Sequence, residues 1–332
     1  MPNPRFDMHA HFYGGGLAAL LTRRETAPYL RVASDGTRWM GAMNGEFPFS
    51  ADYDDADAVL AQMDAQGISH RLITFPGALG VDLLPVDTCE TAICAFNDHL
   101  AALGAQSSNR LIGLAGLPLA DMDRARAELR RVRRALNLPG VILPGNYFLS
   151  LAEMEALRPI LAEADAHGCH VMVHPGLKVG QSAPPPPSDH PQYRLSAVAL
   201  QSSIADMALT LVLSDAVSAY PNVSFQVVNL GGTLPFIVER ITAIAAHRNP
   251  NAPFPLERLR ALWFDTASLG PNALRAAIAL YGSARIMLGS DFPIFKGNPG
   301  DTVDGAGLDP ATRAAISHGN AERLLRGLGW RG

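Results

Sequence analysis

Eight short apolar runs recur along the chain, each ending in turn or polar residues, and longer segments with helical spacing separate them. Runs of this length and composition are typical of parallel strands that are buried on both faces. Their alternation with helices predicts an α/β protein. The predicted strands are Arg5–Phe12, His70–Phe75, Leu111–Leu117, Gly140–Leu143, His170–His174, Val223–Asn229, Leu262–Thr266 and Ile286–Asp291.

The segments between these strands carry apolar residues three and four positions apart, as a helix with one buried face does. Eight such β/α units close most naturally as a (β/α)8 TIM barrel, whereas a doubly wound sheet would usually have fewer strands and a glycine-rich first turn. A mixed open sheet is the structural alternative. At 332 residues and 48% hydrophobic, the chain is expected to form one barrel domain over residues 1–332. The clearest helical segments are Asp57–Gln66, Met122–Leu136, Leu151–Ala166 and Ala311–Leu328.

Two connections are too long for simple loops between a strand and a helix. The first, residues 13–53, holds several aromatic side chains among glycines, so we expect a small insertion after the first strand that caps the barrel mouth. The second follows the fifth strand from Pro175 to about Tyr193. It contains Pro184 to Pro187, which favours an extended and stiff loop.

The charge pattern argues against a nucleic-acid partner. The chain has 27 Lys and Arg against 31 Asp and Glu, a formal net charge of -4, and no basic run suggests a surface that follows phosphates. The first residues, MPNPRFDMHAHF, lack the basic start and apolar core of a secretory signal, and no apolar run reaches membrane-spanning length. We therefore expect a cytoplasmic protein that binds neither nucleic acid nor a membrane.

The cysteines are assigned no chemistry. Cys89, Cys94 and Cys169 are odd in number and show no Cys-x-x-Cys spacing, so neither a disulfide framework nor a thiolate zinc site is supported. We expect three reduced thiols in the core.

Three histidines and one aspartate are predicted to meet at one end of the barrel. His9 and His11 lie two residues apart in the first strand, so their side chains leave the same face. His174 ends the fifth strand and Asp291 the eighth, at the rim where barrel active sites lie. Taken singly, the histidine pair also fits a solvent-facing strand, and Asp291 a helix cap. Together they match one divalent ion, Zn²⁺ first and Mn²⁺ as the alternative.

Seven short motifs recur together in one known family. They are DMHAHF at Asp7–Phe12, FNDHL at Phe96–Leu100, GLAGLPL at Gly113–Leu119, MVHPG at Met172–Gly176, NLGGTLPFIVER at Asn229–Arg240, LGSDFP at Leu288–Pro293 and GNAERLL at Gly319–Leu325. With them the chain resembles, over nearly its whole length, the amidohydrolase superfamily. The resemblance is to the branch that includes aminocarboxymuconate-semialdehyde decarboxylase and the 6-methylsalicylate and γ-resorcylate decarboxylases.

The resemblance implies a (β/α)8 barrel with a small element inserted after the first strand, a homodimer, and one zinc or similar ion held by His9, His11, His174 and Asp291. It also implies that Arg240 corresponds to an arginine that, in the muconate enzyme, reaches a neighbouring subunit's site and holds a substrate carboxylate. A bidentate guanidinium suits that task. An ion pair on a helix surface is the alternative for Arg240.

One position departs from the family's pattern. The decarboxylases usually have a histidine at the end of the sixth strand, as His-x-Gly-Gly, and here that position is Asn229. An asparagine cannot accept a proton near neutral pH, so any acid or base role must move elsewhere or be absent. Asn229 can still orient a substrate oxygen by hydrogen bonding. The alternative is that it caps the following helix through Gly231 and Gly232.

Three further positions are expected near the site or below it. Asp265 ends the seventh strand and could hydrogen-bond to a metal ligand, although a structural role is preferred. His170 lies four residues before His174, near the barrel bottom, and is expected to be structural. Phe292 follows a metal ligand, as Phe12 does, and is expected to pack on an aromatic substrate, with core packing as the alternative.

These observations predict a metal-dependent, nonoxidative decarboxylase, a carbon-carbon lyase, whose substrate is a small aromatic or muconate-type carboxylic acid. The metal would bind the carboxylate, Arg240 would neutralise charge, and Asp291 would deliver the proton that replaces CO₂. The first alternative is a metal-dependent hydrolase of a lactone or amide bond, with Asp291 as the base. The second is a barrel that has lost catalysis and binds a carboxylate ligand.

Overall fold

Eight parallel strands form the centre of the molecule in a computed structural model, which describes residues 4–42 and 45–331. The strands are β1 Phe6–His11, β5 His70–Thr74, β6 Leu111–Leu114, β7 Gly140–Pro144, β8 Cys169–His174, β9 Val223–Val227, β10 Trp263–Asp265 and β11 Ile286–Met287. All eight predicted strands are present: six are shorter than predicted by one to four residues, and β7 and β8 are longer by one residue.

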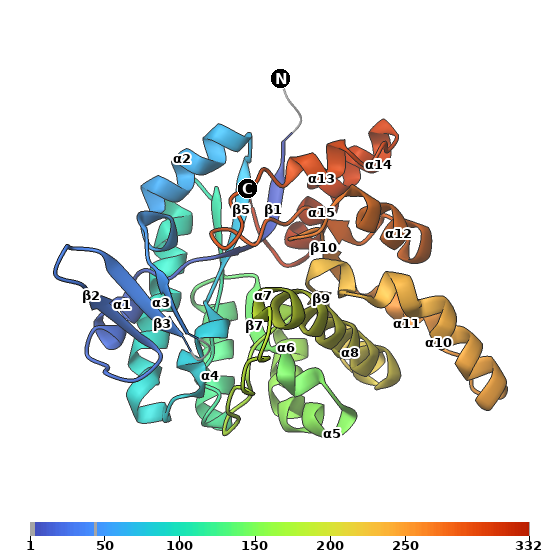
Figure 1. The fold of residues 1–332 in the computed structure, drawn as a ribbon, viewed down its shortest axis with the longest axis horizontal. Helices are drawn as coiled ribbons and strands as arrows, with labels where there is room; N and C mark the ends of the chain where they lie inside the picture. Colours follow the sequence, from blue (N-terminus) through green and yellow to red (C-terminus); the bar gives the residue numbers. More distant parts are fainter. Residues whose placement is uncertain (1–3, 43–44, 332) are drawn as a thin grey trace.

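The strands close on themselves. Hydrogen bonds order them as β1-β5-β6 and β11-β10-β9-β8-β7. A parallel bridge between Ala115 and Val141 joins β6 to β7, and the amide of Met8 donates to the carbonyl of Leu288 at 2.8 Å, joining β1 to the segment after β11. The predicted barrel is therefore confirmed, and the mixed open sheet is wrong. Figure 1 shows the helices arranged around these strands.

Helices follow the strands and cover the barrel. Aspartates cap three of them: Asp55 accepts from the amides of Asp57 and Ala58, Asp121 from those of Asp123 and Arg124, and Asp309 from those of Ala311 and Thr312. The longer helices are α2 Ala56–Gln66, α3 Val86–Gln106, α4 Met122–Arg134, α6 Arg158–His167, α8 Leu200–Leu213, α10 Leu234–Arg248, α12 Pro271–Tyr281 and α15 Asn320–Gly327. The shorter ones are α1 Gly16–Leu21, α5 Leu151–Met154, α7 Pro191–Tyr193, α9 Ala216–Ala219, α11 Leu256–Ala261, α13 Gly300–Asp304 and α14 Pro310–Ala314.

Two predicted helices are interrupted. The segment Leu151–Ala166 divides into α5, a 3₁₀ turn at Glu155–Leu157 and α6, where Pro159 in the first turn has no N–H to continue the helix before it. The segment Ala311–Leu328 contains a π-helical turn at Ala315–Gly319 between α14 and α15. Periodicity of apolar residues reports the buried face and is insensitive to these local changes of winding.

The insertion after β1 contains an antiparallel three-stranded sheet, β2 Tyr29–Val32, β3 Arg38–Ala42 and β4 Gly45–Pro48. It lies at one edge of the molecule in Figure 1, opposite α10. The second long connection has no regular structure from Pro175 to His190, which includes the prolines at 184–187. The three cysteines are free, as predicted; Cys89 and Cys169 are buried in the core, but Cys94 is only partly buried.

One expectation about hydropathy is wrong. The helical run Pro191–Leu213, made of α7, a π-helical turn and α8, is 23 residues long with a mean hydropathy of 1.5, which is enough by length and composition to cross a membrane. Its second half packs into the core through Ile204, Met207 and Leu211. Its first half exposes Tyr193 and Val198, each to 66%. Core burial of the second half thus accounts for part of its apolar character.

Candidate metal centre

The four predicted ligands converge at one end of the barrel. One donor atom from each of His9, His11, His174 and Asp291 lies within 4.8 Å of the others. The ring centroids of His9 and His11 are 5.3 Å apart, and that of His174 lies 5.2 Å from His9 and 4.7 Å from His11. Strand geometry explains this meeting, because β1 and β8 are parallel and end at the same rim.

Asp291 reaches the cluster from a loop and not from a strand, which corrects the predicted strand end. β11 stops at Met287, and Asp291 has a left-handed backbone with φ of 61°. Its amide donates to the carbonyl of His9 at 2.7 Å, and this bond places Oδ1 at 3.1 Å from Nε2 of His11. Close packing of this loop requires Gly289, since a Cβ there would lie 2.9 Å from that of Asp265 and 3.0 Å from that of His9.

Each histidine is oriented through its Nδ1 atom. His9 Nδ1 lies 3.1 Å from Asp265 Oδ1, His11 Nδ1 lies 2.7 Å from Thr74 Oγ1, and His174 Nδ1 lies 3.0 Å from the carbonyl of Pro175. Partners at Nδ1 leave the Nε2 lone pairs for a common centre. The buried Nε2 of His9 has no hydrogen-bond partner among the described residues. A cation at the centre would supply that partner, and the donor set suits a divalent ion.

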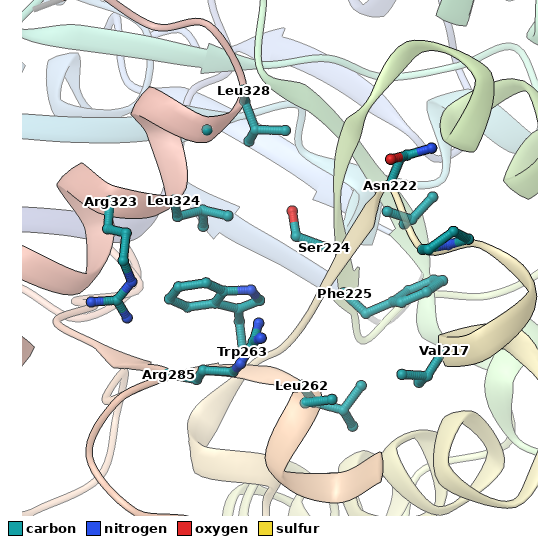
Figure 2. A pocket seen from close by; sticks show the side chains of 14 residues that line it. Val217, Asn222, Ser224, Phe225, Leu262, Trp263, Arg285, Arg323, Leu324 and Leu328 are labelled. Carbon is teal, nitrogen blue, oxygen red and sulfur yellow. The ribbon is translucent and has the colours of Figure 1, made fainter. Parts of the chain in front are cut away.

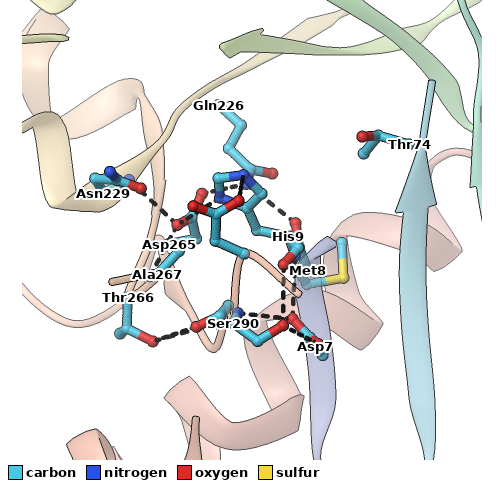
Figure 3. Close-up of polar contacts among 12 residues, drawn as sticks. Asp7, Met8, His9, Thr74, Gln226, Asn229, Asp265, Thr266, Ala267 and Ser290 are labelled. Atoms are coloured by element: carbon cyan, nitrogen blue, oxygen red, sulfur yellow. Dashed lines mark hydrogen bonds and ion pairs between the residues drawn. The ribbon is translucent and has the colours of Figure 1, made fainter. Parts of the chain in front are cut away.

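Behind His9 lies a buried polar chain that Figure 3 shows in part. Asp265 accepts from His9 and also from Gln226 Nε2 at 2.7 Å. Gln226 Nε2 donates as well to the carbonyl of Met8 at 3.2 Å, so Gln226 Oε1 faces His170 Nε2 at 2.8 Å. His9 is 1% exposed and the other three side chains are fully buried. The preferred structural interpretation of Asp265 is therefore incomplete, because Asp265 contacts a metal ligand directly.

The direction of the hydrogen bonds from His170 through Gln226 and Asp265 to His9 determines which ring nitrogen carries a proton in each histidine. The amide nitrogen of Gln226 faces two acceptors, so its oxygen must accept the N–H of His170 Nε2. His170 is neutral, since burial lowers its pKa to about 4, and its Nδ1 then accepts the Ser224 hydroxyl at 3.1 Å. Asp265 in turn holds a proton on Nδ1 of His9. The expected structural role of His170 thus extends, through two residues, to a metal ligand.

A second buried group connects β1 to the Asp291 loop. Asp7 Oδ2 accepts from Arg71 Nε at 2.8 Å and from Ser290 Oγ at 2.6 Å, and Asp7 Oδ1 accepts from the Ser290 amide at 2.9 Å. Arg71 also lies over the ring of Phe292 at 4.5 Å. Sequence reasoning assigned no role to Asp7, Arg71, Ser290 or Gln226, although Asp7 and Ser290 lie inside the motifs DMHAHF and LGSDFP.

Electrostatics at the centre favour a cation. Burial lowers the pKa of His9, but the carboxylates of Asp265 and Asp291 outweigh it and raise that pKa to about 9. Burial and the neighbouring His11 and His9 hold the pKa of His174 well below its ordinary value. Without a metal, His9 therefore keeps a second ring proton near neutral pH, and a divalent ion would replace that proton.

The predicted substrate contacts occupy different surroundings. Asn229 is 4% exposed, its side-chain Oδ1 has no partner among the described residues, and its backbone N–H donates to Asp265 Oδ1 at 3.2 Å. It does not cap α10, whose N-cap is Thr233. Arg240 is exposed on α10 and is not one of the four clustered residues. Phe292 is 1% exposed against Arg71, so it is a core side chain here, and its contact with substrate stays a prediction.

The base of the insertion adjoins the cluster. Tyr13, directly after β1, packs against Tyr53 and Phe49 with ring centroids 5.1 and 5.8 Å away. Burial, together with the nearby Tyr53 and Asp291, raises the pKa of the Tyr13 phenol. The insertion is thus anchored beside the metal ligands by an aromatic cluster that the sequence indicated only as an aromatic-rich segment.

Comparisons with known proteins agree with this arrangement. The sequence pattern of the family described as Amidohydrolase matches residues 6–327. The chain is 26% identical over 283 residues to 2-amino-3-carboxymuconate-6-semialdehyde decarboxylase of Dictyostelium discoideum, covering 82% of this chain and 76% of that protein. It is 26% identical over 310 residues to 6-methylsalicylic acid decarboxylase of Penicillium expansum, covering 87% and 85%. A gamma-resorcylate decarboxylase of Rhizobium radiobacter is 26% identical over 288 residues, covering 82% and 88%.

Solved structures share the fold. Metarhizium anisopliae IDCase in apo form has a TM-score of 0.81 at 19% identity, covering 99% of this chain and 98% of that one. A 5-carboxyvanillate decarboxylase from Novosphingobium aromaticivorans, complexed with manganese and a nitrobenzoic acid, has a TM-score of 0.77 at 18% identity, covering 98% and 96%. A 2,6-dihydroxybenzoate decarboxylase complexed with 2,6-dihydroxybenzoate has a TM-score of 0.73 at 21% identity, covering 98% and 99%.

Proposed function

Because the chain belongs to the amidohydrolase family, we propose that it is a metal-dependent decarboxylase that removes CO₂ nonoxidatively from a small aromatic or muconate-type carboxylic acid. The observation that carries the proposal is the cluster of His9, His11, His174 and Asp291 at the barrel rim. The activities of the curated relatives support the choice of reaction. We propose Zn²⁺ as the ion, from the three imidazoles and one carboxylate, with Mn²⁺ as the alternative.

The reaction breaks the bond between the carboxyl carbon and the ring or chain, releases CO₂ and adds a proton to the carbon left behind. A bound divalent ion supplies electrostatic stabilisation of the negative charge that develops on the substrate. Asp291 is the proposed proton donor: its carboxylate first takes a proton from water or from a substrate hydroxyl, and then gives it to the carbon that loses CO₂. Its Oδ1 faces the histidines, and its side chain is 15% exposed against 1% for His9 and 5% for His11, so it is the more accessible of these to substrate.

Asn229 is proposed to bind substrate through its side-chain amide. Its unpartnered, buried Oδ1 requires a hydrogen-bond donor, which a substrate hydroxyl or amine would provide. The side chain cannot take up a proton, so it orients substrate and does not act as a base. Phe292, which follows Asp291 in the sequence, is proposed to pack against the substrate.

We propose that the protein works as a homodimer in which Arg240 reaches the partner's site. Phe236, one turn before Arg240 on α10, is 91% exposed, and a large exposed apolar side chain of this kind is typical of an interface. Tyr193 and Val198 are exposed on the helical run that ends in α8, and that run meets α10 where the amide of Thr233 donates to the carbonyl of Gln201 at 3.1 Å. Gly232 permits this approach, since a Cβ there would lie 2.0 Å from the same carbonyl.

A mixing experiment tests the shared site. Arg240→Ala and Asp291→Asn are each expected to be inactive alone, while their mixed dimers regain activity, because the site with an intact Asp291 receives Arg240 from the other subunit. If mixing restores nothing while mass measurement shows dimers exchanging subunits, Arg240 does not act across the interface. A monomer in solution would contradict the homodimer itself.

The activity is tested by incubating the metal-loaded protein with carboxyl-labelled hydroxybenzoates and an aminocarboxymuconate semialdehyde and measuring labelled CO₂. Release by the wild-type protein and its loss in Asp291→Asn, with metal content measured in both, is the expected result. No release from any compound, at full metal content, would overturn the proposal.

The hydrolase is the second candidate because Asn229 removes the histidine of the decarboxylase pattern, while a hydrolase can use Asp291 as its base. A panel of lactones and amides, tested on the same preparations, distinguishes it. A barrel that binds carboxylates without turnover would fail both panels and show CO₂ release only after Asn229→His. The cytoplasmic location and the lack of a membrane or nucleic-acid partner stay predictions.

A further inference from the structure

A pocket of about 270 Å³ lies at the end of the barrel opposite the metal ligands. Val223 and Trp263, the first residues of β9 and β10, line it, whereas His11 and His174 are the last residues of β1 and β8. Figure 2 shows Arg285 and Arg323 beside the Trp263 indole, with Ser224 and Asn222 across from it. The proposed reaction uses no residue of this pocket.

The pocket carries positive charge without compensation. Arg285 and Arg323 both line it, and among the described residues no aspartate or glutamate does. Partial burial and the like charge of Arg323 lower the pKa of Arg285. Both arginines are exposed to solvent, and their guanidinium carbons lie 5.0 and 5.6 Å from the centre of the Trp263 ring, so an anion can reach both of them from solvent at the rim of the pocket.

Hydrogen-bond donors in the pocket also lack acceptors. Trp263 is only 6% exposed, and its indole Nε1 is buried and has no hydrogen-bond partner in the described part of the chain. Arg323 is held in place by the side chain of Asn320 at 3.1 Å and by the carbonyl of Ala284. Arg285 lies with its guanidinium carbon 5.0 Å from the Trp263 ring, and no side-chain hydrogen bond ties it to the described residues. A buried donor left unpaired is costly, so the pocket favours an acceptor.

The rest of the lining limits what that acceptor can be. The Ser224 hydroxyl donates to Nδ1 of His170, so it is not a free donor for an anion at that side of the pocket. Leu262, Leu324 and Leu328 supply apolar walls. We infer that this pocket binds a small organic carboxylate, with its charged end at Arg285, Arg323 and the Trp263 indole and its apolar body against the leucines.

Benzoate is the probe for this site, with binding measured by calorimetry on the metal-loaded protein. Asp291→Asn is included because it alters the metal centre and leaves the pocket at Arg285 and Arg323 unchanged, so that benzoate binding at the two sites can be distinguished. In the wild type and in Asp291→Asn we expect saturable benzoate binding that Arg285→Gln weakens roughly tenfold or more, the loss expected for one charge-assisted bidentate contact. Trp263→Phe should weaken it by a smaller factor, since it removes only the indole N–H.

The matched control is Arg313→Gln, which removes the same charge from an exposed position in α14 outside the pocket. Thermal unfolding of each variant confirms that it is folded, and Arg285→Lys keeps the charge but not the forked donors. Benzoate binding that is unchanged in Arg285→Gln and Arg323→Gln, or lowered equally by Arg313→Gln, would overturn the inference. Absence of decarboxylase activity would leave it standing, because the two sites lie at opposite ends of the barrel.

Discussion

Replacing Gln226 by leucine should weaken metal binding although Gln226 touches no metal ligand. The side chain is fully buried and makes three hydrogen bonds, to Asp265, to the carbonyl of Met8 and from His170. Leucine is similar in size to glutamine but removes the Gln226 Nε2 that donates to Asp265 Oδ2 at 2.7 Å. Loss of a hydrogen bond to a charged group lowers the free energy of unfolding by about 1.5 to 3 kcal/mol.

Asp265 would then be held only through Oδ1, by His9 and by the backbone amides of Asn229 and Ala267, so its carboxylate could shift against His9 or take up a proton on Oδ2. Either change releases the ring that Asp265 orients, and loss of such a supporting contact costs about 10- to 100-fold in metal affinity, or about 1.4 to 2.7 kcal/mol. Affinity is measured by competition with a chelating dye at fixed pH, and stability by calorimetry of the metal-free protein.

Asn97→Leu is the matched control. Asn97 is also fully buried and makes three hydrogen bonds, with the carbonyl and amide of Gly116 and with Glu128. Both variants should lose stability, and only Gln226→Leu should lose metal affinity. Equal metal affinity in the wild type and Gln226→Leu, or an equal loss in both variants, would refute the role assigned to the polar chain.

Two further predictions concern pH. The pKa of His9 is raised to about 9 in the metal-free protein, so metal binding displaces a proton from His9 below that pH. The apparent metal affinity should therefore rise about tenfold per pH unit from about pH 6.5 to 8.5. Dye competition measures this affinity, and an affinity that does not change with pH would contradict the assignment. Burial raises the pKa of Asp82 from 3.8 to about 8, so folding takes up a proton and stability falls as pH rises through this window. Asp82→Asn should therefore stabilise the protein by roughly 1 to 4 kcal/mol near pH 7 and by little near pH 4, and an equal gain at both pH values in thermal unfolding would contradict it.

The sequence predicted those parts of the site that local periodicity determines. His9 and His11 share a face because strands alternate, and His174 ends a run that is apolar up to that residue. Asp291 was found for a partly wrong reason: it follows an apolar run, but its own left-handed backbone, four residues beyond β11, places it. A φ of this sign on a non-glycine residue is set by tertiary contacts, here the bond to the His9 carbonyl.

The supporting network could not be predicted because its partners are far apart in the sequence. Gln226 and Asp265 are separated by 39 residues, and Asp7 and Ser290 by 283. Nothing in the local pattern of β9 distinguishes a buried glutamine that pairs with a carboxylate from one that faces solvent. Hydropathy alone also gave no account of the apolar run Pro191–Leu213, because the mean hydropathy of a helix does not show which half of it packs against the barrel.

Anomalous diffraction from crystals of the zinc-reconstituted protein tests the central claim most directly. We predict one peak per chain, at about 2.0 to 2.2 Å from Nε2 of His9, His11 and His174 and from Oδ1 of Asp291. A fully reconstituted protein without a peak there, or with its only peak elsewhere on the chain, would contradict the account.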